Sequence, residues 1–101
     1  QSEGEPDLVG QLIDLFAQES PPQVAAIARA VAEGDADSLR QTAHSLKSSA
    51  ANLGAGALAA ICAELEKRGR GGEAAGLEPQ VAALETEFER ACLALERVRT
   101  G

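Results

Sequence analysis

The sequence contains no tryptophan, tyrosine or methionine, and it has only two aromatic residues, Phe16 and Phe88. Alanine and leucine instead supply 33 of the 101 residues. Both are strong helix formers, whereas the residues favoured in strands are scarce. The composition therefore argues against an all-β fold and predicts an all-α protein. The length predicts one domain with a single core.

Basic residues and long apolar runs are also scarce. Nine Lys and Arg stand against sixteen Asp and Glu, which gives a net charge of −7. Nucleic acids and anionic membrane surfaces both attract a basic face, and the scattered cations do not supply one. No apolar run approaches the roughly 20 residues that span a bilayer. We therefore expect neither nucleic-acid binding nor membrane contact.

The two cysteines, Cys62 and Cys92, are too few for a disulfide framework. Reduced thiols and the lack of an apolar signal segment predict a cytoplasmic protein. Residues 1–6 are acidic and lack an initiator methionine, so we expect them to be the remnant of a linker in a longer chain. Residues 100–101 are expected to form a short tail.

Glycines and prolines divide the chain into five predicted helices, at residues 7–19, 21–33, 36–53, 55–68 and 79–99. Short links between amphipathic helices favour antiparallel neighbours. We therefore predict an antiparallel four-helix bundle within residues 7–99, with the short first helix packing at one end. The glycine-rich segment 68–72 is predicted to be a flexible loop.

Local signals set the predicted helix ends. Ser20 is expected to cap the second helix, while Gly34 and Asp35 are expected to end it and to cap the third. Apolar residues at helical spacing form the predicted seams of the third, fourth and last helices: Leu39, Ala43, Leu46, Ala50 and Leu53; Leu58, Ile61, Cys62 and Leu65; Val81, Leu84, Phe88, Cys92, Leu95 and Val98.

The single histidine, His44, falls at the edge of the stripe that contains Ala43 and Leu46. Its neighbours on the helix are cationic, polar or small: Arg40, Gln41, Lys47, Ser48 and Ala51. A neutral imidazole is a nucleophile, nearby cations suit an arriving phosphoryl group, and small side chains leave room for a partner. A lone histidine is more often a simple boundary residue, so the spacing leaves both interpretations open.

Residues 43–55, AHSLKSSAANLGA, resemble the signature of histidine-containing phosphotransfer (HPt) domains, A-H-x-L-K-G-x-x-x-x-x-G. The likeness covers roughly residues 7–99. Other positions similar to the family are Pro22, the Gly34-Asp35 pair, Leu39, Leu58, Cys62, the Leu65-Glu66 pair and the Leu84-Glu85 pair.

The resemblance implies a four-helix bundle that acts as a phosphorelay intermediate. By position, His44 would accept a phosphoryl group on a ring nitrogen from an aspartyl phosphate of a receiver domain, and another receiver would take it onward. Lys47 would neutralise the phosphoryl oxygens, and Gly54 is the last glycine of the motif. Ser48 replaces the glycine that follows the lysine. It is still small, and its hydroxyl could hydrogen-bond the ring or the phosphate.

We expect no cofactor or metal in the chain itself. No glycine-rich phosphate loop precedes a helix, so we expect neither nucleotide binding nor kinase activity. Cys62, Cys92 and His44 lack the helix-turn spacing of zinc ligands. The resemblance implies that the receiver supplies Mg²⁺. It also suggests that the chain is a module of a hybrid sensor kinase.

One acidic residue and one apolar edge each have both a structural and a functional interpretation. Glu66 could face His44 across the bundle and orient its other ring nitrogen, but we expect an ordinary exposed helix glutamate. Leu12, Leu15 and Phe16 are expected to cover the bundle end, and part of this apolar edge could dock a receiver.

Two other functions stay open from the sequence. One is a helical adaptor that binds a receiver or kinase partner through the same face without phosphotransfer. The other is a structural bundle within a larger chain. The pairing of His44 and Lys47 with small neighbours favours the phosphorelay, because an inert bundle does not need it.

Overall fold

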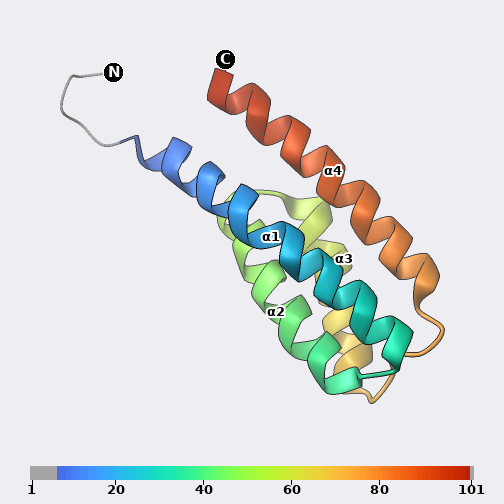
Figure 1. Cartoon of the computed structure of the whole chain (residues 1–101). Helices are drawn as coiled ribbons and strands as arrows, with labels where there is room; N and C mark the ends of the chain where they lie inside the picture. Colours follow the sequence, from blue (N-terminus) through green and yellow to red (C-terminus); the bar gives the residue numbers. More distant parts are fainter. Residues whose placement is uncertain (1–6, 101) are drawn as a thin grey trace.

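The computed structural model describes residues 7–100, which form four α-helices. They are α1 (Leu8–Glu33), α2 (Ala36–Asn52), α3 (Gly56–Arg70) and α4 (Glu78–Thr100). Successive helices run in opposite directions, and each packs against two others (Figure 1). The prediction of an all-α antiparallel four-helix bundle is confirmed. The predicted linker at residues 1–6 and Gly101 of the predicted tail lie outside the described residues.

The prediction of an additional short N-terminal helix is wrong. Residues 7–19 and 21–33 belong to one helix, because α1 runs through Pro21 and Pro22 without a break. Ser20, the predicted cap, lies inside α1 and is only 1% exposed. The N-terminal half of α1 therefore does not cross the bundle end but continues along the bundle axis beside α4 (Figure 1).

The packing of α1 explains why the two prolines do not end it. Proline has no N–H, so the carbonyls of Ala17 and Gln18 lose their helical donors. Both of these residues and the prolines themselves are exposed, so water can bond the free carbonyls. The buried side chains of Phe16 and Val24 anchor α1 on either side of the prolines. Tertiary packing thus outweighs the local signal to stop.

The two predicted turn glycines are confirmed. Gly34 ends α1 with a left-handed φ of 69°, and the Asp35 carboxylate accepts a hydrogen bond from the Ser38 N–H at the start of α2. Gly54 has a φ of 73° and lies between α2 and α3. Glycine adopts this conformation without the strain that a Cβ causes. These short turns place α2 directly against both of its neighbours, α1 and α3.

The core is mainly aliphatic and follows most of the predicted seams. Its fully buried members come from all four helices: Ile27, Leu39, Ala43, Leu46, Ala50, Cys62, Leu65 and Leu84. α1 and α4 are longer than the other two helices and extend past the α2–α3 turn (Figure 1). Val98 is 61% exposed in this extension, so its predicted seam role is wrong. An ion pair between Asp14 and Arg99 joins the two long helices there.

The end of α3 also differs from the prediction. Residues 68–70, expected in a flexible loop, form its last turn, and Gly69 is buried. A Cβ at Gly69 would lie 2.8 Å from the Ala36 carbonyl oxygen and from the Arg40 nitrogen. The missing side chain therefore lets the end of α3 lie directly against α2. This close approach brings Arg70 next to the helix that carries His44.

Candidate functional site

The imidazole of His44 projects from the middle of α2. Its side chain is 60% exposed, although the neighbouring seam residues Ala43 and Leu46 are fully buried. The helical register explains this, because one residue beyond a buried position turns the side chain by about 100°. The ring is therefore accessible to another protein while its backbone is fixed by the core.

Glu66 on α3 lies directly beside this ring, so the expectation that Glu66 is an exposed helix residue is wrong. Its side chain is only 4% exposed, and Oε2 lies 2.9 Å from His44 Nδ1. A carboxylate accepts hydrogen bonds, so this contact places the ring proton on Nδ1. The alternative interpretation, in which Glu66 orients the ring, agrees with this geometry.

The Glu66 carboxylate is shared by two further cations. Lys47 Nζ donates to Oε1 at 2.6 Å, and Arg70 Nη2 donates to Oε2 at 2.7 Å. Burial alone would raise the pKa of a carboxyl group. Here the hydrogen bond from Lys47, supported by that from His44, instead lowers the pKa of Glu66. The site thus contains a buried, ionised carboxylate with its partners in place.

Arg40 and Gln41, two of the predicted helix neighbours of His44, bind a different partner. Arg40 Nη2 and Gln41 Nε2 each donate to the Asp37 carboxylate at 2.9 Å. These contacts lie one turn before His44 and do not involve its ring. Arg40 therefore contributes positive charge near the site without a direct bond to its members.

The small neighbours of His44 leave one side of the ring open. Ser48 and Ala51 are both exposed on α2. The Ser48 hydroxyl donates to the His44 backbone carbonyl at 3.2 Å, so it is not bonded to the ring in this state. Gly54, the last glycine of the motif, contributes through its turn conformation and not through the site itself.

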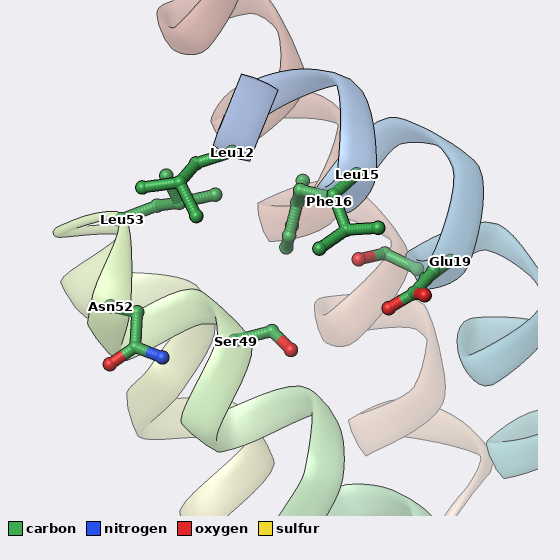
Figure 2. Close-up of a pocket in the computed structure, with 8 residues that line it drawn as sticks. Leu12, Leu15, Phe16, Glu19, Ser49, Asn52 and Leu53 are labelled. Carbon is green, nitrogen blue, oxygen red and sulfur yellow. The ribbon is translucent and has the colours of Figure 1, made fainter. Parts of the chain in front are cut away.

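A small pocket of about 90 Å³ lies between α1 and the C-terminal half of α2 (Figure 2). Leu12 and Leu15, each 48% exposed, line it from α1, while Ser49, Asn52 and Leu53 line it from α2. These exposed leucines fit the expected docking edge. Phe16 does not, because it is 4% exposed and its ring packs 5.8 Å from that of Phe88. Phe16 belongs to the core that supports the edge.

Comparison with known protein families matches residues 11–97 to the Hpt domain. The chain belongs to the Hpt domain family. A crystal structure of histidine-containing phosphotransfer protein B (HptB) from Pseudomonas aeruginosa PAO1 is similar over 99% of this chain and 97% of that chain. The two share 29% sequence identity with a TM-score of 0.80. No curated protein sequence matches the chain.

Family membership and the likeness to HptB make this Hpt domain a phosphorelay intermediate of two-component signalling. Its expected place within a hybrid sensor kinase stays a prediction. None of the helices between residues 7 and 100 is long and apolar enough to cross a membrane. The same part of the chain contains no group of three His, Cys, Asp or Glu residues that could hold a metal ion.

The two cysteines of the Hpt domain are free thiols. Cys62 is completely buried in the core, as predicted, and Cys92 is partly buried. Burial raises the pKa of the Cys62 thiol to about 12. A thiol that stays protonated is a poor nucleophile and metal ligand, so Cys62 has a packing role.

Sequence reasoning missed Arg70 as a member of the site. Its neighbouring glycines predicted a loop, whereas α3 continues to Arg70. One available signal was the spacing of Glu66 and Arg70, which is the i, i+4 pattern of a helical ion pair. That pattern indicates a contact only if the helix extends this far.

Proposed function

We propose that His44 is the phosphoacceptor of this Hpt domain and that Nε2 is the reacting atom. The observation that carries the proposal is the exposed ring whose Nδ1 is engaged by the buried carboxylate of Glu66. A proton held on Nδ1 leaves the lone pair on Nε2 as the nucleophile. The donor is an aspartyl phosphate on a receiver domain, and a second receiver takes the group onward.

The reaction needs alignment and charge neutralisation more than covalent work by the protein. The Nε2 lone pair attacks phosphorus, the P–O bond to the receiver aspartate breaks, and its electron pair stays on the aspartate carboxylate. The proton on Nδ1 does not have to leave. Transfer to the second receiver reverses these steps.

Lys47 is the residue proposed to neutralise the phosphoryl oxygens. It lies one turn from His44 on α2, and its side chain is 34% exposed. Its ammonium group and the ring contact the two oxygens of the same Glu66 carboxylate. Mg²⁺ is supplied by the receiver domain in this mechanism, and the chain contributes a rigid platform with one cation close to the phosphoryl group.

The exposed edge formed by Leu12 and Leu15 is proposed to dock the receiver. Interfaces combine an apolar centre with a polar rim, and this edge borders the polar residues Ser49 and Asn52 of α2. The edge lies on α1 and faces α2, the helix that carries His44, so a receiver that covers both can also reach the ring. The free cysteines and the receiver partner support a cytoplasmic location.

The alternative function is an adaptor that binds a receiver or kinase without phosphotransfer. Both functions use the same surface, but only phosphotransfer requires the ring of His44. The test is incubation of the chain with a receiver carrying radiolabelled phosphate. We expect an acid-labile, base-stable label on the chain, which His44→Gln abolishes while circular dichroism stays helical. Receiver binding without any label on the folded wild-type chain would favour the adaptor.

A further inference from the structure

The buried carboxylate of Glu66 has one more cation than its charge requires. Lys47 binds Oε1 at 2.6 Å, and Arg70 binds Oε2 at 2.7 Å. Either cation alone provides a counter-charge for this carboxylate, whose side chain is 4% exposed. The second cation therefore becomes available when another anion arrives nearby.

Lys47 has two competing partners once His44 is phosphorylated. Before transfer its ammonium group is bound to Glu66, and during transfer it is needed at the phosphoryl oxygens. Leaving Glu66 without a counter-ion would be strongly unfavourable, because a buried charge needs a partner. Lys47 can therefore move only if other positive charge remains on Glu66. The phosphorylated ring keeps its Nδ1 proton and is itself cationic, but the phosphoryl group on the same ring more than offsets that charge, so a second cation is needed.

Arg70 is placed to be that cation. It binds Oε2, the oxygen that also contacts His44, whereas Lys47 binds Oε1. Departure of Lys47 thus leaves the contacts of Oε2 intact. The close packing of Gly69 on α2 fixes the backbone at the end of α3, from which the Arg70 side chain reaches Glu66.

We propose that Arg70 is a positioning residue that holds Glu66 during phosphorylation and so frees Lys47 for the phosphohistidine. This inference rests on the proposed role of His44 as the phosphoacceptor. Arg70 acts through Glu66, and its predicted effect is on the position of the transfer equilibrium. Arg70 stabilises the phosphorylated chain relative to the unphosphorylated chain.

Formal charges show why the transfer equilibrium depends on Arg70. Before transfer, with a neutral ring, the three side chains of Lys47, Arg70 and Glu66 carry one net positive charge. A doubly charged phosphoryl group on a ring that keeps its Nδ1 proton adds one net negative charge. The phosphorylated site is then neutral. Without Arg70 the same site carries an uncompensated negative charge after transfer, which opposes phosphorylation.

The test measures the equilibrium between a phosphorylated receiver and the chain, approached from both directions. We expect Arg70→Ala and Arg70→Gln to lower the equilibrium constant for chain phosphorylation roughly tenfold, and Arg70→Lys to restore most of it. Arg68→Ala is the matched control, because Arg68 lies on the same helix but pairs with Glu64 and Glu73. An unchanged equilibrium in folded Arg70→Ala would overturn the inference.

A double-mutant cycle with Glu66→Gln decides whether Arg70 acts through Glu66. Once the buried charge is removed, Arg70→Ala should change the equilibrium less than about twofold. A full tenfold loss in the Glu66→Gln background would mean that Arg70 acts directly on the phosphoryl group, which contradicts the positioning role. Failure of the proposed function has a different readout from failure of this inference. The wild-type chain would then take up no label, or the label would persist in His44→Gln.

Discussion

His44 and Glu66 are 22 residues apart in the sequence, and their side chains meet across the α2–α3 contact with Nδ1 2.9 Å from Oε2. The imidazole is exposed to solvent while its partner is buried. This arrangement fixes one ring nitrogen against the protein and leaves the other for a partner. We therefore expect the reactivity of this surface histidine to depend on a buried carboxylate.

Removal of the Glu66 side chain should slow phosphotransfer although the nucleophile stays in place. In Glu66→Ala the ring loses the contact that sets its tautomer and orientation. We expect the rate of transfer from a receiver to fall roughly 10- to 100-fold, by analogy with metal-bound histidines that lose the carboxylate orienting them. The rate is measured by rapid quench with labelled receiver. Glu64 lies on the same helix but pairs with Arg68, so Glu64→Ala should transfer at the wild-type rate. If Glu66→Ala transfers as fast as Glu64→Ala, Glu66 does not orient the ring.

Glu66 should also make the stability of the fold depend on pH. The hydrogen bond from Lys47 lowers the pKa of Glu66 in the folded chain, and the unfolded value is about 4.3. A carboxyl group with a lowered folded pKa stabilises the fold above its unfolded pKa, and this stabilisation is lost as pH falls through the folded pKa.

We therefore expect the difference in the free energy of unfolding between wild type and Glu66→Gln to shrink as pH falls from above the unfolded pKa of about 4.3 through the lowered folded pKa. Urea unfolding at a series of pH values measures it. A difference that stays constant across this range would show that the charge of Glu66 does not contribute.

Lys47→Ala should reduce the transfer rate and leave the fold intact. The ammonium group is lost from the phosphoryl site, while Arg70 still neutralises Glu66. We expect transfer to slow about tenfold, as for loss of one charge-stabilising donor, with an unchanged circular dichroism spectrum. Lys67→Ala is a matched control, because Lys67 is an exposed lysine of α3. Unchanged transfer in Lys47→Ala would rule out its neutralising role.

Leu15→Asp should weaken receiver binding without affecting the bundle. Leu15 is 48% exposed and lines the pocket between α1 and α2, so a charge there stays solvated in the free chain but is desolvated in a complex. We expect the dissociation constant, measured by calorimetry, to rise about tenfold or more. Leu93→Asp, which changes an exposed leucine of α4, should bind as wild type does. Equal weakening by both changes would place the docking edge elsewhere.

Pro22→Ala should stabilise the domain. The substitution restores an N–H that can donate to the Gln18 carbonyl inside the continuous helix α1. Proline is about 3 kcal/mol less favourable than alanine within a helix, and part of this is offset by the stiffer unfolded chain. We expect a gain of about 1–2 kcal/mol in urea unfolding. A loss of stability would indicate that α1 is not continuous at the prolines.

The helical seams could be predicted because the sequence carries their spacing directly. Leu39, Ala43, Leu46 and Ala50 follow the 4,3 pattern, and all four are fully buried. The continuity of α1 was not predictable in the same way, since Pro21 and Pro22 give a local stop signal that only packing overrides. A propensity argument does not contain that packing energy.

The site was predictable only in part, for a related reason. His44 and Lys47 lie on one helix, so their proximity follows from sequence spacing. Glu66 and Arg70 lie on another helix, and the contact between the two depends on how closely α3 approaches α2 at Gly69. One hint was present, because Cys62 and Glu66 are four residues apart and so share the buried face of α3.

The central claim concerns one atom, Nε2 of His44. Phosphorus NMR of the chain after phosphorylation by a receiver, with nitrogen-labelled histidine, identifies the ring nitrogen that is bonded to phosphorus. The account predicts a single phosphohistidine signal coupled to Nε2 and absent from His44→Gln. A phosphorus signal coupled to Nδ1, or one that persists in His44→Gln, would contradict it.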